Sequence, residues 1–482
     1  MNAKSLFSDI RVVIALSVAL PVAPLFSQSR LECSDEISKR PVKAYEYVVT
    51  CDRKDGVYRC GEQAKIAVRV RNEETGGPAK SGTVRVRLDA ADDKVFRTDV
   101  HDLGKEGPVF TVVATLSKPG LLRLRLSKDD SDKSHYWGVV FDPSAIPPGV
   151  DDPPDFDRFW ADAYAKYVRN VPFGFEMRYE KQQTTQWNDV YRFSFNAPDG
   201  KTRLYGFISY PKDRTRKYPL RFEVPSAGVG SWTLGPSTYQ RDRTVNVLLN
   251  IFPFEMPPTL EESRKLYDAY CKDLKDRYGA GHYMAAGMGA SREDSVLYNY
   301  FLGAKRCIEW LYAQPEVDQK RFYYWGASQG GGYGTCVVGL SGLFTKAVLL
   351  VPCLVDDLGR YGRLPSGSGS GMMDQQSRPE ARENAKRNWP YFSAENFARR
   401  IACETMVTVG LCDPTCVAHG GWSIYNLIPA PKKCIVGAVN QQHGPPDPVW
   451  YGSQQWLLNE PGWKETFGEQ FDYIHFNQGT GR

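Results

Sequence analysis

The sequence predicts an α/β protein with a mostly parallel sheet, preceded by an N-terminal β-sandwich of immunoglobulin type. Residues 40–142 contain short runs in which apolar and polar residues alternate, which is typical of the strands of a sandwich. Residues 171–482 contain continuous apolar runs that alternate with helical segments, which is typical of a parallel sheet covered on both faces. A proline-rich stretch within residues 143–170 lies between these regions and predicts a linker between two domains.

The first 27 residues predict a secretory signal peptide. Two basic residues precede an apolar run from Val12 to Leu20, and Pro21 and Pro24 interrupt its continuation. The run is shorter than the roughly 20 residues that a membrane helix needs. We therefore expect cleavage near Ser27 and a protein that is secreted or periplasmic, with no membrane span.

Residues 40–142 predict strands by a period of two. Ile66, Val68 and Val70 alternate with Arg69 and Arg71, and similar runs are "TVRVRLDA", "GPVFTVVATL" and "GLLRLRL". Gly, Pro and Asp stand between the runs, as turn residues do between short strands. This region contains no convergent set of catalytic residue types.

The eleven cysteines are compatible with disulfides in an exported protein. In "CDRKDGVYRC", a two-residue Asp-Gly turn would place Cys51 opposite Cys60 at a non-hydrogen-bonded pair, within disulfide range. We therefore expect a bridge between them. Cys412 and Cys416 have a C-x3-C spacing, but no second pair lies nearby in the sequence, so we expect no metal site.

The segment "DPSAIPPGVDDPPDF" predicts an extended linker, and a short amphipathic helix should follow it. Aromatic and small residues recur there at helical spacing, so one face of this helix should dock on the next domain. These residues are Phe156, Phe159, Trp160, Ala163, Tyr164 and Tyr167.

The region after residue 171 predicts a series of strands. Three candidates come first, "GFEMRYEK", "DVYRFSFNAPDG" and "RLYGFISYPK". Apolar runs separated by helical segments follow: "LRFEVPSAG", "VNVLLNIF", "FYYWGAS", "KAVLLVPC", "TMVTVGL" and "KKCIVGAV". The helix before the third of these runs should begin at a capping pair of Ser291 and Asp294 and end before Pro315.

Ser328 in "WGASQGGG" is the candidate nucleophile. It lies between the apolar strand from Phe322 to Trp325 and a helical segment, so the pattern G-x-S-x-G has the strand, turn and helix that a nucleophile elbow requires. The turn forces the serine into a strained backbone conformation, and side chains two positions away would collide with the neighbouring strand and helix.

A catalytic serine needs a base, which an acid holds in place. In a parallel sheet of this kind the chain order is serine, acid, histidine, with each residue after the carboxyl end of a strand. His443 follows the last predicted strand in "NQQHGPPDP" and is the favoured base. His419, which should lie at the start of a helix, and His475, near the terminus, are the alternatives.

Asp413 directly follows "TMVTVGLC" and is the favoured acid. Asp356 and Asp357, which follow the preceding strand, are the alternative pair. The oxyanion needs two backbone donors. The N–H of Gln329 should supply one, and the glycine-lined loop at "SAGVGSW" should supply the other, from Gly228 or Val229.

These residues resemble the acetyl xylan esterase and cephalosporin C deacetylase family of α/β-hydrolases. The similar segments are "DPPDFDRFWADA", "AKRCIEWLYAQPEVDQKR", "WGASQGGG", "VGLCDPTC" with "YNLI", and "QQHG". The resemblance implies an α/β-hydrolase fold, with Ser328, Asp413 and His443 on the triad positions of the family. It also places Gln329 and Gly228 on the oxyanion positions, where Gly228 stands in place of a tyrosine of the family.

The resemblance implies an exported serine esterase that removes acetyl groups from xylan or related oligosaccharides, without a metal or an organic cofactor. Esterases for other acyl groups, feruloyl esterases or general carboxylesterases, are one alternative. A serine peptidase of the prolyl oligopeptidase kind is another, but it carries a propeller domain that residues 40–142 are too few to form. A carbohydrate-binding protein with a hydrolase scaffold is disfavoured, because the serine, acid and histidine are all present in order.

The expected partner is an acetylated polysaccharide or oligosaccharide. Trp232, Tyr283 and Trp450 are candidates for stacking on its sugar rings. Nucleic acid is not expected, because the net charge of +5 comes from 61 basic and 56 acidic residues spread along the chain. A homo-oligomer is compatible with the sequence, but the ring-shaped assembly of the family is not assumed. The role of the Ser-Gly loop at residues 366–371 stays open.

Overall fold

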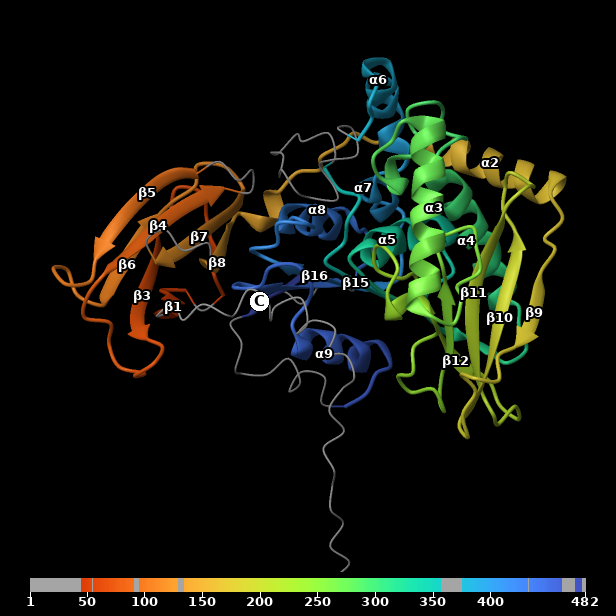
Figure 1. Cartoon of the computed structure of the whole chain (residues 1–482), viewed down its shortest axis with the longest axis horizontal. Helices are drawn as coiled ribbons and strands as arrows, with labels where there is room; N and C mark the ends of the chain where they lie inside the picture. The colour runs from red at the N-terminus through yellow and green to blue at the C-terminus, as the bar shows by residue number, and fades with distance from the viewer. Residues whose placement is uncertain are drawn as a thin grey trace, which may run out of the picture.

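The computed structural model describes residues 45–53, 55–90, 95–128, 134–356, 375–431, 433–461 and 473–478. Figure 1 shows two small sheets at one end of the molecule and a large sheet with helices on both faces at the other. The predicted signal peptide, Asp357 and the Ser-Gly loop lie outside the described residues.

Two sheets form the N-terminal part and are called the N-terminal sheets below. The three-stranded sheet has the order β1 (Tyr45–Cys51), β3 (Ala64–Asn72) and β6 (Val109–Ala114). The five-stranded sheet has the order β2 (Val57–Tyr58), β8 (Ser134–Phe141), β7 (Gly120–Lys128), β4 (Thr83–Ala90) and β5 (Val95–Asp102). In β3, Ile66, Val68 and Val70 are buried and the residues between them are exposed, which confirms the period of two.

The predicted hairpin and its disulfide are wrong. Strand β1 pairs with β3, so that Cys51 lies opposite Ile66, and β2 pairs in parallel with β8. The two segments therefore belong to different sheets, and no disulfide joins Cys51 to Cys60. The N–H of Cys60 donates to the carboxylate of Asp142 at 2.9 Å. Burial and the Asp142 carboxylate raise the pKa of the Cys60 thiol to about 11.

The proline-rich connector is packed against the rest of the chain. It contains a 3-10 helix, η1 (Pro143–Ala145), and the N–H of Gly149 donates to Glu395 Oε1 at 2.7 Å. Helix α2 (Phe156–Asn170) follows, and it buries Phe156, Trp160, Ala163 and Tyr167, as its spacing predicts. The expected amphipathic helix is therefore present, but the connector before it is held by hydrogen bonds to distant residues.

The large sheet has ten strands and is mostly parallel at its centre. Its order is β18 (Tyr473–Gln478), β17 (Lys433–Ala438), β16 (Glu404–Gly410), β15 (Lys346–Leu350), β14 (Val317–Ala327), β12 (Tyr218–Glu223), β13 (Val245–Leu249), β11 (Arg203–Pro211), β10 (Asn188–Asn196) and β9 (Glu176–Tyr179). Strands β12 to β17 are parallel to their neighbours within this group, and β9, β10, β11 and β18 are antiparallel additions. The predicted parallel sheet is thus confirmed.

Helices cover both faces of the large sheet. One face packs against α4 (Val296–Tyr312), α5 (Gln329–Ser341) and α8 (Ala418–Leu427), and the other against α9 (Asp447–Leu457). Further helices are α3 (Leu260–Tyr278), α6 (Pro379–Asn388) and α7 (Ala394–Ala398), with short 3-10 turns at η2 (Ser231–Thr233), η3 (Tyr283–Ala285) and η4 (Trp389–Tyr391). None of the helices in the described part of the chain is long and apolar enough to cross a membrane.

The start of α4 differs from the prediction by one turn. Ser291 and Asp294 do bond to each other, but they close a turn that precedes the helix. The N-cap is Ser295, whose hydroxyl accepts the N–H of Leu297. A serine does cap this helix, as the sequence predicts, but it is Ser295, four residues after Ser291, that accepts an N–H of the first turn.

Candidate active site

Ser328 lies on a sharp turn between β14 and α5. Its φ of 58° and ψ of −116° are a strained conformation for a residue with a side chain. The glycines two positions away permit this turn. A Cβ at Gly326 would lie 2.7 Å from the carbonyl oxygen of Gly330, and a Cβ at Gly330 would lie 2.2 Å from the carbonyl oxygen of Val224. The turn therefore projects the serine from the carboxyl edge of the sheet.

Ser328, His443 and Asp413 form a hydrogen-bonded chain. Ser328 Oγ lies 3.0 Å from His443 Nε2, and His443 Nδ1 lies 2.9 Å from Asp413 Oδ2. The three residues follow β14, β17 and β16, whose carboxyl ends meet at one edge because the strands are parallel. Asp413 is buried, and its Oδ1 also accepts the N–H groups of Thr415 and Cys416, at 2.7 and 2.9 Å. These bonds hold the carboxylate in one orientation.

The alternative residues lie elsewhere. His419 is buried in α8, where burial lowers its pKa to about 4, and His475 lies in β18 opposite Val436. Asp356 lies beside Gly149, and its N–H faces the carboxylate of Glu395 at 3.5 Å. The terminal strand that carries His475 was not predicted.

Tyr283 connects the two predicted oxyanion residues. The N–H of Gly228 donates to the hydroxyl of Tyr283 at 3.3 Å, and this hydroxyl donates to the side-chain oxygen of Gln329. Gln329 Nε2 in turn donates to the carbonyl of Pro225 at 3.1 Å. Burial raises the pKa of Tyr283 well above its usual value, so that the hydroxyl keeps its proton. The backbone N–H of Gln329 lies in the first turn of α5, where no intrahelical acceptor is available.

The three predicted sugar-stacking residues have different environments. Trp232 is 45% exposed in the loop after β12, next to Gly230. Trp450 is partly buried and packs edge-to-face on Trp325, with ring centroids 4.4 Å apart. Tyr283 is 2% exposed, so the prediction that it stacks on sugar is wrong. Its polar end instead satisfies the buried amide of Gln329, and no local sequence signal marks this long-range contact.

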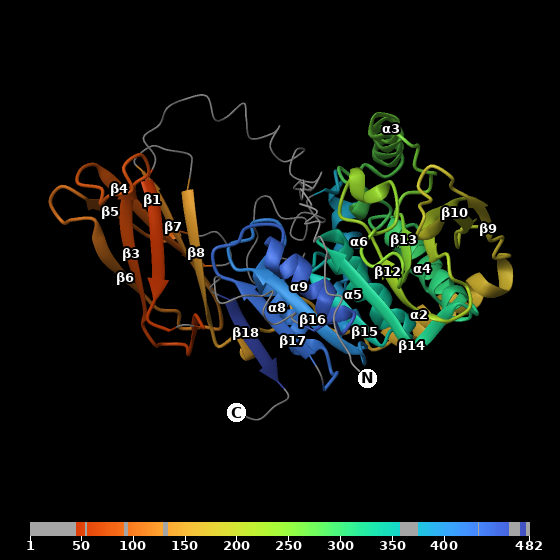
Figure 2. The same ribbon diagram turned by 90° about the horizontal axis from the view of Figure 1, so that it is seen from below.

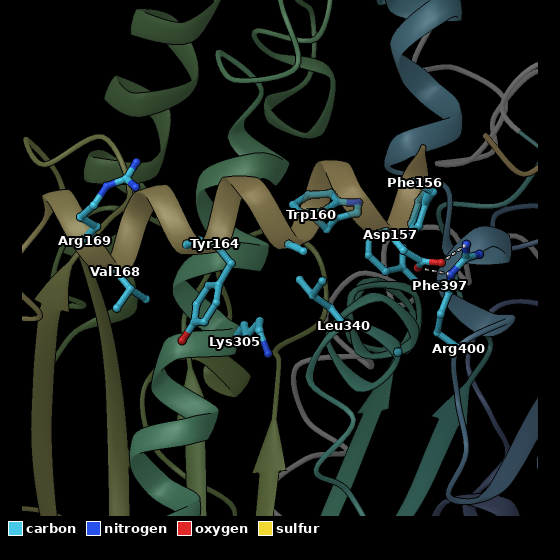
Figure 3. A pocket seen from close by; sticks show the side chains of 13 residues that line it. Phe156, Asp157, Trp160, Tyr164, Val168, Arg169, Lys305, Leu340, Phe397 and Arg400 are labelled. Carbon is cyan, nitrogen blue, oxygen red and sulfur yellow. Dashed lines mark hydrogen bonds and ion pairs between the residues drawn. The ribbon is translucent and has the colours of Figure 1, made fainter. Parts of the chain in front are cut away.

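A groove of about 640 Å³ lies beside α2, away from this site (Figure 3). Its walls include Asp157, Tyr164, Lys305 and Arg400, and none of the three hydrogen-bonded residues lines it. In the described ranges, no group of three or more His, Cys, Asp and Glu side chains is arranged to hold a metal ion.

Comparisons with known proteins agree with one another. Residues 148–457 match the family described as acetyl xylan esterase (AXE1). The chain is 26% identical over 419 residues to the acetyl esterase Axe7A of Xylanibacter ruminicola, which covers 86% of this chain and 91% of that protein.

Two solved structures share the fold of this chain over 66% of its length. Acetyl xylan esterase 1 from Thermoanaerobacterium sp. JW/SL YS485 has a TM-score of 0.54 and 20% identity, and the likeness covers 66% of this chain and 97% of that chain. The acetyl xylan esterase from Paenibacillus sp. R4 has a TM-score of 0.54 and 17% identity, over 66% of this chain and 98% of that chain. The likeness identifies the fold as that of the α/β-hydrolases.

Proposed function

This chain belongs to the acetyl xylan esterase family and is a carboxylic ester hydrolase, and we propose that it removes acetyl groups from xylan or related oligosaccharides by means of Ser328, His443 and Asp413. The observation that carries this proposal is the hydrogen-bonded chain from Ser328 Oγ through the imidazole of His443 to the buried carboxylate of Asp413. The same arrangement of nucleophile, base and acid catalyses acyl transfer on several unrelated folds.

In the first half of the reaction, Ser328 Oγ attacks the acetyl carbonyl carbon while His443 Nε2 takes the hydroxyl proton. Asp413 accepts the Nδ1–H of His443 and so keeps Nε2 free of a proton before the attack. The sugar hydroxyl then leaves with the proton from His443, and an acetyl group stays on Ser328. Water then attacks the acetyl carbonyl carbon while His443 Nε2 takes a proton from it, the bond to Ser328 Oγ breaks, Ser328 regains its proton from His443, and acetic acid is released.

The developing oxyanion would be stabilised by the backbone N–H groups of Gln329 and Gly228. The first is free of an intrahelical acceptor. The second makes only a 3.3 Å contact with the Tyr283 hydroxyl, which is long for a hydrogen bond, so that a charged oxyanion can replace it as the acceptor. Tyr283 is a positioning residue in this scheme, because it holds both Gly228 and the side chain of Gln329.

The loop after β12 is the proposed binding surface for the sugar of the substrate. Trp232 is exposed in the same loop as Gly228, and a sugar ring attached to the acetyl group can stack on its indole. Trp450 has only part of its surface free and is the weaker candidate.

We further infer a two-domain organisation for the exported protein. The two N-terminal sheets support a β-sandwich domain at residues 40–142, and the large sheet with its helices supports a catalytic domain at residues 171–482. The basic and apolar pattern of residues 1–27 supports export, as expected for an enzyme that acts on a polysaccharide too large to enter a cell.

The test is hydrolysis of 4-nitrophenyl acetate and of acetylated xylan by wild type and by Ser328→Ala. We expect the variant to lose about 10³-fold or more in kcat with an unchanged thermal unfolding midpoint, as for other serine triads. Ser341→Ala, at the other end of α5, is the matched control and should keep wild-type activity. Turnover by Ser328→Ala at the wild-type rate would refute the mechanism.

A further inference from the structure

Three residues form a row across the five-stranded N-terminal sheet. Asp89 of β4 lies opposite Arg123 of β7, and Arg123 lies opposite Gly138 of β8. Directly opposite residues project from the same face of a sheet, so the row lies on one face. Arg123 Nε and Asp89 Oδ1 are 2.6 Å apart, and the two side chains are only 5% and 7% exposed. Such burial of an ion pair means that another part of the chain covers this face.

The covering part consists of the segments after β16 and β17. A Cβ at Gly138 would lie 2.6 Å from the Cβ of Leu411, so any residue other than glycine would push the segment after β16 away. The N–H of Gly138 donates to the carbonyl of Val439, after β17, at 2.7 Å. Figures 1 and 2 both show β8 on the side of the N-terminal sheets that faces β16 and α8.

These two segments carry the acid and the base. Leu411 precedes Asp413 by two residues, and Val439 precedes His443 by four. The segments are also tied to each other, because the thiol of Cys412 donates to the carbonyl of Val439 at 3.3 Å. That carbonyl therefore accepts from both the N-terminal sheet and the acid-bearing loop.

The nucleophile is held in a different way. The N–H of Ser328 donates to the carbonyl of Leu350 in β15 at 2.9 Å, and Gly330 packs against the end of β12. The first support is in the large sheet, and the second is Val224, directly after strand β12 of that sheet. The acid and the base therefore have a support in the N-terminal sheets that is separate from the support of the serine.

We propose that the N-terminal sheets position the catalytic acid and base, and that Gly138 is the positioning residue at this contact. This inference rests on the roles proposed above for Asp413 and His443. The contact keeps the segments 411–413 and 439–443 at the separation that the hydrogen bond between Asp413 and His443 needs. The proposed site of the acetyl group is beside Ser328, and its oxyanion donors are the N–H groups of Gln329 and Gly228, so displacement of the acid and base lowers kcat and leaves KM unchanged.

The first test is Gly138→Ala, assayed with 4-nitrophenyl acetate. Relief of the 2.6 Å contact to an ordinary carbon–carbon distance moves the segment of Leu411 by roughly 1 Å, and a shift of that size costs up to about 10²-fold. We expect kcat to fall about 10- to 100-fold with KM unchanged. The control is Ile66→Ala in the core of β3, which loses stability through a cavity but should keep wild-type kcat. Wild-type kcat in Gly138→Ala, or an equal loss in Ile66→Ala, overturns the proposal.

The second test needs no substrate and no variant at the contact. Hydrogen exchange followed by mass spectrometry compares wild type with Ile66→Ala, whose N-terminal sheets open more often. We expect peptides from 411–416 and 439–443 to exchange faster in the variant and the peptide from 328–332 to be unchanged. Unchanged exchange in the two segments, or an equal increase at 328–332, overturns the proposal. If wild type hydrolyses no ester, the proposed function fails, and this measurement still decides the positioning.

Discussion

Replacing Asp413 by Asn should abolish most of the activity by changing which nitrogen of His443 carries the proton. Asp413 Oδ1 accepts two backbone N–H groups, from Thr415 and Cys416, at 2.7 and 2.9 Å, and Oδ2 lies 2.9 Å from His443 Nδ1. In the asparagine variant the carbonyl oxygen must take the Oδ1 position, because the two N–H groups need an acceptor. The amide NH2 then faces His443 Nδ1.

An NH2 group at that position is a donor, so Nδ1 must be the acceptor and the imidazole proton moves to Nε2. Nε2 lies 3.0 Å from Ser328 Oγ and can then no longer take the serine proton. We expect kcat to fall about 10⁴-fold, which corresponds to about 5.5 kcal/mol in the activation barrier. KM should be unchanged, because the proposed substrate contacts do not include Asp413.

The assay is steady-state hydrolysis of 4-nitrophenyl acetate, with thermal unfolding as the measure of folding. Asp356→Asn is the control, since Asp356 is the rival carboxylate and asparagine tolerates its φ of 46°. We expect this control to stay within about threefold of wild type in kcat, as a substitution outside the hydrogen-bonded chain should. An Asp413→Asn variant within tenfold of wild type, or an equal loss in Asp356→Asn, would refute the reasoning.

Three further predictions concern neighbouring residues. Tyr283→Phe removes the partner of the buried Gln329 side chain and should lower the free energy of unfolding by about 1–3 kcal/mol; an unchanged urea midpoint would contradict this. Burial lowers the pKa of His419 to about 4, so between pH 6.5 and about 4 its imidazole gains a proton in the unfolded state but not in the folded state. The free energy of unfolding therefore falls as the pH is lowered through this window, by up to about 1.4 kcal/mol per pH unit. His419→Gln should reduce that slope in urea unfolding measured between these pH values, and an identical slope would argue against it. Trp232→Ala should raise KM for acetylated xylo-oligosaccharides about 2- to 10-fold and leave 4-nitrophenyl acetate unaffected; an equal effect of Trp187→Ala, a similarly exposed control, would contradict a specific stacking role.

Much of the candidate site could be predicted because its signals are local or follow chain order. The run "WGASQGGG" specifies a strand, a strained turn and a helix within a few residues, since only glycine fits where Gly326 and Gly330 meet neighbouring carbonyls. The order of Ser328, Asp413 and His443 follows from the parallel sheet, whose carboxyl ends form one edge. The sequence favoured Asp413 but left Asp356 as an alternative, because both residues follow strands of that sheet; in the structure the carboxylate of Asp413 lies 2.9 Å from His443 Nδ1.

The sequence alone determined the strands and the class of the fold, because burial leaves a pattern along the chain. Burial on one face gives the period of two at Ile66, Val68 and Val70, and burial on both faces gives the continuous apolar runs after residue 171. The partner of each strand was decided by the tertiary structure. Cys51 lies opposite Ile66 and not Cys60, because the pairing of β1 depends on packing between segments and not on the turn that follows it. The contacts of Tyr283 with Gln329 and of Gly138 with Leu411 join residues that are far apart in the sequence, and contacts of this kind form only when the folded chain brings separate elements together.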